Sequence, residues 1–208
     1  QTYPCRVRVS DSSGNTAEAS VSVITVAALI ALDTFTRADT TSGLGVTETG
    51  ALAWETPTGV WGISSGRASI ITKSGATDFA VINIGRSTNF AVEVEVVGTP
   101  QVSFRYADTA NRFTFGAKDS STLYLRRFVS GVGTTLGAEF AHATVTGDRF
   151  RVSVVGNVIT CLVQSAGSST WTQAVQVTDS ALSGGTRVGM HRYSSAGPVA
   201  TSIMVEPQ

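Results

Sequence analysis

Short apolar runs, alternating or continuous, recur along most of this chain and are separated by Gly, Asn, Asp and Ser. No helical repeat is sustained from residue 33 onward, so strands are the element that this pattern favours. The clearest predicted strands are 69–72, 79–84, 90–97, 101–106, 112–117, 122–128, 149–155, 158–164, 187–193 and 200–205. Gly156 and Asn157 between two of them are typical of a tight hairpin turn. The sequence therefore predicts an all-β protein.

Residues 3–26 are predicted to form a hairpin of their own. Apolar and polar residues alternate over 3–9 and again over 19–26, and turn-forming residues fill 11–15. The spacing of Tyr3 and Cys5 resembles the tyrosine corner of immunoglobulin-type domains, where a Tyr stands two residues before the strand-F Cys. This resemblance implies the last two strands of an Ig-like domain, of the PKD or cadherin-like variety, whose remainder lies upstream.

The predicted division of the chain is residues 1–27 for the Ig-like piece, 28–31 for a short apolar linker and 32–208 for one large β-sandwich. The second piece has too many short strands for a single immunoglobulin module. Two packed sheets of a jelly roll accommodate that number of strands. We therefore expect a double-sheet jelly roll after the linker.

A second resemblance covers roughly 33–208. It rests on the frame Asp33, Phe35, Arg37, Asp39, Leu44, Gly45, Trp54, Gly59, Trp61 and Gly66. The frame resembles the opening of concanavalin A-like lectin/glucanase (laminin-G-like) domains in minor tail proteins of actinobacterial phages. The resemblance implies a concanavalin-like jelly roll located in the virion tail. Its implied partners are other virion subunits in a homo-oligomer and a glycan of the host cell envelope.

Charge and hydropathy exclude several functional classes. The formal net charge is zero and only 14% of the residues are charged, so the basic footprint of a nucleic-acid binder is missing. No apolar run approaches the ~20 residues that a membrane-spanning helix needs, and we expect no membrane insertion. The two cysteines, Cys5 and Cys161, have no metal-binding spacing and are interpreted as buried thiols.

Catalysis is not expected. Glu93 and Glu95 share one face of a strand, about 7 Å apart, which is near the separation that glycosidase carboxylates use. Glucanases of the resembling family carry a further acid in this motif, whereas Val96, Val97 and Gly98 follow here. The two glutamates are therefore interpreted as part of a solvated strand face. His142 and His191 lack neighbours of metal-binding type and are interpreted as structural. The chain is therefore predicted not to be an enzyme.

Calcium is the one metal that the family resemblance suggests, because many laminin-G-like domains hold a calcium ion at their rim. Hard oxygen ligands are needed for it. Asp108 and Asn111 are the candidate ligands, with Asp119 as a further possibility. The same residue types are also favoured in turns. No other cofactor is predicted.

Glycan binding needs an aromatic face beside planar hydrogen-bonding groups. Alternation in strand 101–106 puts Gln101, Ser103 and Arg105 on one face, and alternation in 122–128 groups Tyr124, Arg126 and Phe128. The candidate glycan-binding residues are Arg105, Tyr124, Arg126, His191, Tyr193 and, in a polar loop, Trp171. If Arg105, Tyr124 and Arg126 share the concave face of the jelly roll, they form a glycan platform that His191 and Tyr193 can join. The alternative is ordinary decoration of an outer sheet face. Trp54 and Trp61 are assigned to core or edge packing.

Two functions stay open at this point. The first is an adhesion module that recognises host-surface glycan. The second is a purely structural decoration or connector of the virion. A polysaccharide hydrolase and a secreted bacterial adhesin are weaker alternatives.

Overall fold

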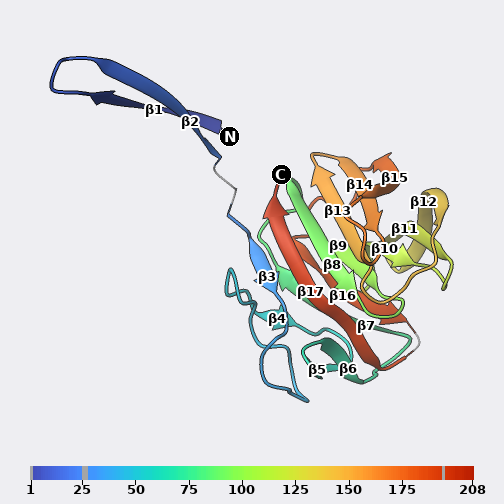
Figure 1. Cartoon of the computed structure of the whole chain (residues 1–208). Coiled ribbons are helices and arrows are strands. Elements are labelled where there is room, and N and C mark those ends of the chain that lie inside the picture. Colours follow the sequence, from blue (N-terminus) through green and yellow to red (C-terminus); the bar gives the residue numbers. More distant parts are fainter. Residues whose placement is uncertain (1, 25–27, 194) are drawn as a thin grey trace.

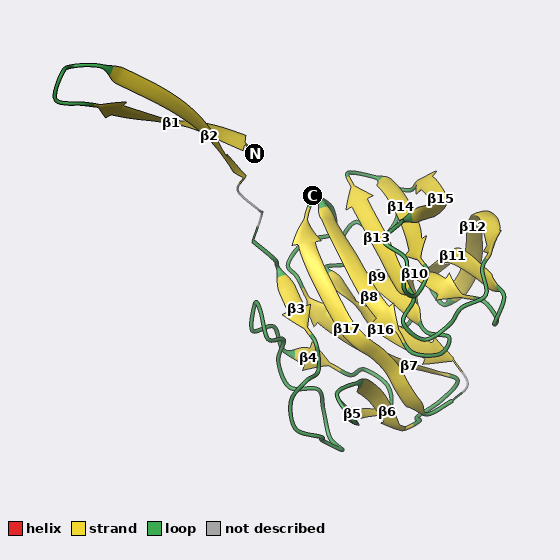
Figure 2. Ribbon diagram, in the orientation of Figure 1, coloured by secondary structure: helices red, strands yellow, loops and turns green. Residues whose placement is uncertain are grey.

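The computed structural model describes the backbone of residues 2–24, 28–193 and 195–208, and the side chains of residues 10–16, 28–193 and 195–208. Every regular element in these ranges is a strand (Figure 2). The strands are β1 (Thr2–Ser10), β2 (Thr16–Ile24), β3 (Ala31–Asp33), β4 (Trp54–Glu55), β5 (Val60–Ile63), β6 (Ala68–Thr72), β7 (Thr77–Asn83), β8 (Phe90–Val96), β9 (Gln101–Asp108), β10 (Asn111–Ala117), β11 (Thr122–Val129), β12 (Val132–Ala141), β13 (Arg149–Val155), β14 (Val158–Gln164), β15 (Thr172–Thr178), β16 (Arg187–Tyr193) and β17 (Gly197–Pro207). The described residues include no helix suited to crossing a membrane.

Two antiparallel sheets form the sandwich (Figure 1). One runs in the order β12-β11-β10-β9-β16-β7-β4 and is called here the β9–β16 sheet. The other runs in the order β15-β14-β13-β8-β17-β6-β5, with β3 also paired to β17, and is called the β8–β17 sheet. Neighbours that are distant in sequence, such as β9 with β16 and β8 with β17, make this a jelly roll rather than a meander. The predicted all-β sandwich is confirmed.

The core lies between the two sheets and follows the strand period of two. In β13, Phe150, Val152 and Val154 are completely buried, while Arg149 and Arg151 alternate with them on the outer face. Phe104 and Phe113 of the opposite sheet stack with ring centroids 5.3 Å apart within the same core. Burial of one such side chain contributes about 1.5–3 kcal/mol, so the alternating pattern is what drives the two sheets together.

The frame that carries the second resemblance closes around Asp33. This fully buried carboxylate accepts hydrogen bonds from the backbone N–H of Phe35, the guanidinium of Arg37 and, at 2.8 Å, the indole Nε1–H of Trp54. Trp61 is also fully buried, and its Nε1–H donates to the carbonyl of Thr58 at 3.1 Å. The assignment of Trp54 and Trp61 to core and edge packing is confirmed.

The N-terminal hairpin is confirmed for the backbone. β1 and β2 pair with each other in continuous antiparallel register from Thr2 opposite Ile24 to Ser10 opposite Thr16. They form a separate sheet (Figure 1). The side chains of Tyr3 and Cys5 lie outside the described residues, so the Ig-like identity of this piece stays a prediction. Cys161 is a buried free thiol, as expected.

Candidate functional site

The outer face of the β9–β16 sheet gathers four of the residues predicted to bind glycan. Register places Tyr124 opposite Gly116 and Arg126 opposite Thr114, while Thr114 lies opposite Ser103. Across the sheet His191 lies opposite Gln101 and Phe79. Residues paired in this way share a face. We call this surface the arginine–aromatic face and define it by Phe79, Arg112, Tyr124, Arg126, Phe128, His191 and Tyr193.

Guanidinium groups stack on aromatic rings along this face. The Cζ of Arg112 lies 3.8 Å from the ring centroid of Phe128 and 4.7 Å from that of Phe79. The Cζ of Arg126 lies 4.6 Å from the Phe128 centroid and 5.6 Å from that of Tyr124. Each such contact stabilises by about 0.5–2 kcal/mol, more where water is excluded. The planar groups are thus held in fixed positions on the sheet.

Arg126 is the member of this face whose donors are least used. It makes no hydrogen bond and no ion pair to any residue that the structure describes, and its Nε is buried. Its guanidinium extends across β12 over Gly133, which lies opposite Phe128. A Cβ at position 133 would collide with that guanidinium and would lie 2.8 Å from Cε1 of Phe128. Glycine at this position therefore makes room for Arg126.

His191 is fully buried at the inner end of the face. Its Nδ1 lies 2.8 Å from Oγ of Ser103, and its ring stacks on Phe79 with centroids 4.8 Å apart. Burial, and then the charge of Arg112, hold the pKa of His191 well below its usual value. The imidazole is therefore neutral, with Nε2 buried and unpartnered among the described residues.

Tyr193 is half-buried and meets the His191 ring edge-on, with centroids 5.1 Å apart. Burial raises the pKa of its hydroxyl, the nearby Tyr124 raises it further, and the charges of Arg112 and Arg126 lower it. Tyr193 stands two residues after His191 on β16, so the two side chains share one face of the sheet. The predicted association of Tyr124, Arg126, His191 and Tyr193 is thus present in the structure.

Arg105 does not belong to this face, and its prediction as a glycan contact is wrong in placement. The registers of β10 and β16 against β9 both shift beside it, and Arg105 has a positive φ of 42°. A bulge of this kind inserts one residue and reverses the alternation after it. Arg105 is fully buried and donates to the carbonyls of Ser87, Asp179 and Gly156 at 2.8–2.9 Å. Arg105 therefore connects three loops through hydrogen bonds to their backbone carbonyls.

Trp171 lies on the other sheet. It directly precedes β15, is half-buried and has Cζ of Arg149 5.8 Å from its ring centroid. β15 and β13 both belong to the β8–β17 sheet. The structure therefore separates Trp171 from the four residues that it brings together.

Unpartnered polar atoms mark the arginine–aromatic face as unusual. Buried side-chain atoms without a hydrogen-bond partner in the described residues include Nε of Arg112 and Arg126, Oγ1 of Thr114, Oε1 of Gln101 and Nε2 of His191. Thr114 lies opposite Arg126 and Gln101 lies opposite His191, so all five atoms are on the side of the sheet that carries this face. Buried polar groups in proteins are nearly always satisfied by protein, water or ligand. Ordered water within the side-chain layer, or a shift of the side chains that cover these atoms, would satisfy them.

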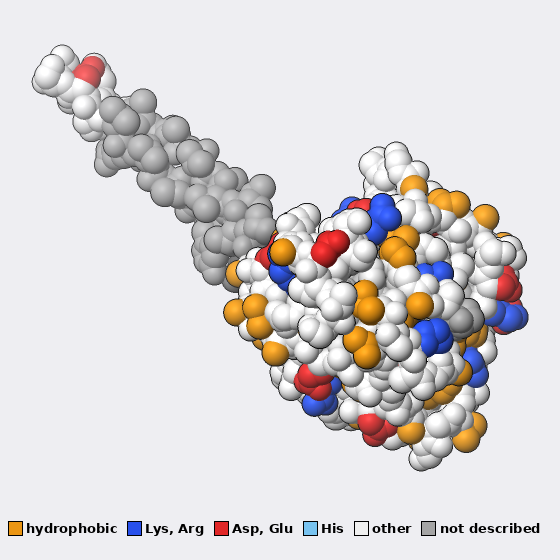
Figure 3. All heavy atoms as spheres, turned by 90° about the horizontal axis from the view of Figure 1, so that it is seen from below, with side chains coloured by type: hydrophobic (Ala, Val, Ile, Leu, Met, Phe, Trp, Pro, Cys, Tyr) orange, Lys and Arg blue, Asp and Glu red, His pale blue; other side chains and the backbone are white. Residues whose placement is uncertain are grey.

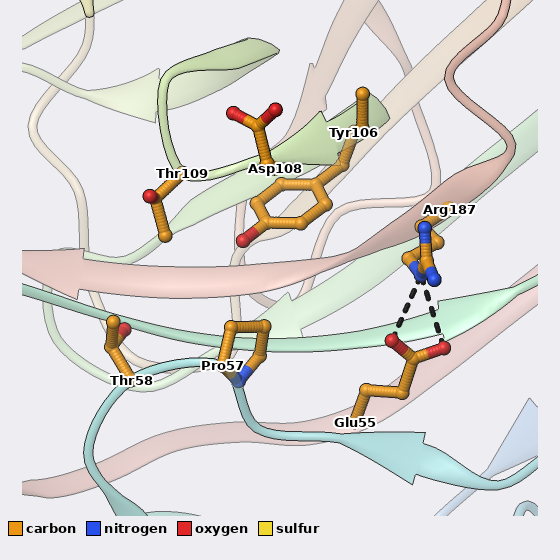
Figure 4. Close-up of a pocket in the computed structure, with 8 residues that line it drawn as sticks. Glu55, Pro57, Thr58, Tyr106, Asp108, Thr109 and Arg187 are labelled. Atoms are coloured by element: carbon orange, nitrogen blue, oxygen red, sulfur yellow. Dashed lines mark hydrogen bonds and ion pairs between the residues drawn. The ribbon is translucent and has the colours of Figure 1, made fainter.

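A cavity of about 330 Å³ adjoins the face at the end of β9 (Figure 4). Pro57, Thr58, Tyr106 and the ion pair between Glu55 and Arg187 line it. The Tyr106 ring lies 5.5 Å from that of Phe79, which connects the cavity wall to the arginine–aromatic face. Burial raises the pKa of Tyr106 to about 12. Its hydroxyl therefore stays protonated and can donate a hydrogen bond.

Asp108, the predicted calcium ligand, also borders this cavity. Its Oδ1 accepts from the backbone N–H groups of Ala110 and Asn111, and the Asn111 amide donates to both carboxylate oxygens at 3.0 Å. These bonds, the Asn111 side chain first, lower the pKa of Asp108. No group of three or more His, Cys, Asp or Glu suited to a metal occurs among the described residues. The donor set is that of a turn, and calcium binding by Asp108 and Asn111 stays a prediction.

The carboxylates considered for catalysis are engaged in other contacts. Glu93 is buried and paired with Arg149 and Arg151, and burial raises its pKa despite these charges. Glu95 accepts a 2.7 Å hydrogen bond from Thr201. The expected solvated strand face is therefore wrong for Glu93, because the long arginine side chains of the neighbouring strand cover it.

Arg112 and Phe79 were missed by reasoning from the sequence. Arg112 begins the regular pairing of β10 with β11 and lies opposite Phe128, on the same face as Arg126. Pairing of these neighbouring strands across their short connection would have placed it there. Phe79 carries no such signal, because β7 reaches this face only through its long-range pairing with β16.

Comparisons with known proteins identify the fold. No family model and no curated protein matches the chain. Among solved structures, a GH43 protein (BlXynB K247S mutant) from Bacillus licheniformis aligns with a TM-score of 0.55 and 14% identity over 97% of this chain, which spans only 46% of that protein. The exoplasmic/lumenal domain of VIP36 aligns at 0.55 with 10% identity, covering 81% and 87% of the two chains.

A protein of unknown function from Shewanella oneidensis aligns at 0.54 with 13% identity, covering 85% of each chain. At such identities a likeness extends to the fold and no further. The chain has a concanavalin-like, lectin-type β-sandwich fold.

Proposed function

We propose that this chain is a glycan-binding module and that the arginine–aromatic face is its binding surface. The observation that carries the proposal is the row of aromatic rings stacked with guanidinium groups on that face, where the N–H donors of Arg126 bind no described residue. Sugars offer apolar ring faces for aromatic contact and many hydroxyls for hydrogen bonding. The fold is compatible with this use, since the VIP36 domain of the same fold was solved with calcium and mannose.

The biological setting belongs to the same proposal. The frame residues from Asp33 to Gly66 resemble tail-protein domains of actinobacterial phages, and on that resemblance we place the module in the virion tail, where it attaches to host-envelope glycan. On the face that Figure 3 shows, side chains of both charges are scattered among uncharged atoms. Assembly with other virion subunits would supply the multivalency that weak sugar contacts need.

A role in hydrolysis is not part of the proposal. Glycosidase chemistry needs two carboxyl groups facing one bond, one of them free to act as an acid. Glu93 is enclosed by Arg149 and Arg151, and Glu95 is hydrogen-bonded to Thr201. We therefore expect no release of reducing sugar from any polysaccharide that the chain binds.

A binding screen with matched aromatic variants tests the proposal. The full chain, displayed at high valency, is applied to a panel of bacterial envelope glycans, alongside Tyr124→Ala and Trp171→Ala. Binding that is lost in Tyr124→Ala and kept in Trp171→Ala supports the proposed face. The reverse result would move the site to the β8–β17 sheet, and no binding by the parent chain would favour the structural connector instead.

A further inference from the structure

Arginine pairing is uneven across the sandwich. Outside the arginine–aromatic face, Arg37, Arg127, Arg149, Arg151 and Arg187 each form an ion pair with Asp or Glu. Among the other described arginines, Arg105 and Arg192 donate to backbone carbonyls instead, and Arg67 and Arg86 have no ion pair with a described residue. Within the described residues, Arg112 and Arg126 form none. Neither guanidinium is therefore neutralised by a direct ion pair, although the formal net charge of the chain is zero.

The contrast is sharpest between adjacent residues of β11. Arg127 points away from the face and pairs with Asp179 at 2.7 Å. Arg126 points onto the face, where its partners are the rings of Tyr124 and Phe128 and the bare backbone of Gly133. Rings and glycine fix the position of a guanidinium without using its N–H donors. Arg126 is thus held in place while its N–H donors bind no described residue.

Arg112 adds a second positive charge to the same face. Its guanidinium lies between the rings of Phe79 and Phe128 and donates one hydrogen bond, to the carbonyl of Thr109. Only 5% of the residue is exposed, so its charge is poorly screened by water. A positive potential from Arg112 therefore reaches the part of the face where Arg126 and Tyr193 are accessible.

We propose that the glycan bound by this face is acidic, and that Arg126 binds its carboxylate or phosphate group while Tyr124 and Tyr193 contact the sugar. The inference rests on the proposed glycan-binding function. A guanidinium presents a planar fork of N–H donors that matches the two oxygens of a carboxylate or phosphate. A neutral sugar would leave the charge of Arg126 and Arg112 unmatched.

Matched polysaccharides separate this inference from the function on which it rests. The full chain is titrated with polygalacturonate and with its carboxyl-reduced galactan, and likewise with phosphomannan and mannan, at one fixed salt concentration. We expect at least tenfold weaker binding after removal of the acidic group. The pair that shows this loss identifies the anion as a carboxylate or a phosphate.

Variants then assign the effect to Arg126. Arg126→Gln should lose at least tenfold in affinity for the acidic polymer, and Arg126→Lys should lose less, because it keeps the charge without the fork. Arg86→Gln removes an equal charge from an exposed loop and should bind like the parent. Unchanged urea midpoints for these variants show that folding is intact.

Four outcomes would overturn the inference. Equal binding of the acidic and neutral polymers leaves glycan binding standing and removes the acidic preference. Equal losses in Arg126→Gln and Arg86→Gln reduce the effect to general electrostatic attraction. If none of these polymers is bound but a neutral envelope glycan is, the acidic preference falls alone, whereas failure with every glycan removes the proposed function as well.

Discussion

Oγ of Ser103 and Nδ1 of His191 lie 2.8 Å apart across the β9–β16 pairing, with both residues fully buried. The two residues are 88 positions apart in sequence. This contact fixes the imidazole against Phe79 and leaves Nε2 directed at no described partner. The inner end of the arginine–aromatic face is therefore built around a neutral histidine, and protonation of that histidine would introduce a charge that the face cannot accommodate.

Stability is expected to fall as the pH drops below 6.5, through His191. Burial and the charge of Arg112 depress its pKa in the folded state, so the unfolded chain binds a proton first, near the ordinary value of 6.5. Stability then decreases with falling pH until the folded pKa is reached. One such group accounts for a loss of about 1 kcal/mol between pH 7.5 and 5.5. Urea unfolding at several pH values measures it.

The control for this expectation is His191→Gln, which cannot titrate. Its absolute stability is expected to be lower, because the stacking on Phe79 is lost. The pH dependence between 7.5 and 5.5 should flatten relative to the parent. An unchanged slope in the variant would assign the acid sensitivity to other groups.

Arg105 is expected to be a stability residue and not a binding residue. Its guanidinium satisfies carbonyls of Ser87, Asp179 and Gly156, and an apolar replacement leaves buried acceptors unpaired. Arg105→Met should lower the free energy of unfolding by about 3–5 kcal/mol. Arg105→Lys should also destabilise, since one ammonium cannot reach carbonyls on separate loops. Denaturant unfolding gives both values, and glycan affinity of the folded fraction should not change.

The fold was predictable because most strands bury one face. All ten predicted strands occur. Runs such as Arg149–Val155 were predictable because apolar, buried residues alternate with polar ones along them. The longest strand that was missed, β12, is mostly exposed and has no apolar period to detect. β15 likewise contains few buried residues. Edge strands are held by backbone pairing to a neighbour, and the sequence records that only weakly.

The candidate site was predictable only where regular alternation held. Tyr124 and Arg126 share a face because β11 follows the period of two at these positions. The predicted face of Arg105 was wrong because a bulge reverses the alternation of β9 in front of Tyr106. No residue type in this strand indicates that bulge. Long-range pairing of β16 with β9 and β7, which brings in His191 and Phe79, follows from topology alone.

The hydrogen bonds to Asp33 are expected to anchor the first part of the sandwich. Trp54→Phe removes one donor to a buried carboxylate and should cost about 1–3 kcal/mol of unfolding free energy. Asp33→Asn weakens the bonds to both Trp54 and Arg37 and should cost more. The double variant should be less destabilised than the sum, because the residues share one network. Urea unfolding of all three variants checks this, and strict additivity would contradict it.

Gly133 is expected to control binding without taking part in it. Any Cβ at this position collides with the guanidinium of Arg126 and crowds Phe128. Gly133→Ala should therefore displace Arg126 and weaken binding of an acidic glycan about tenfold, which corresponds to ~1.4 kcal/mol. Gly184→Ala is the matched control, because a methyl group there meets no atom within 4 Å. Titration of both variants with the same polysaccharide gives the comparison. Equal affinities would mean that the position of Arg126 does not matter for binding.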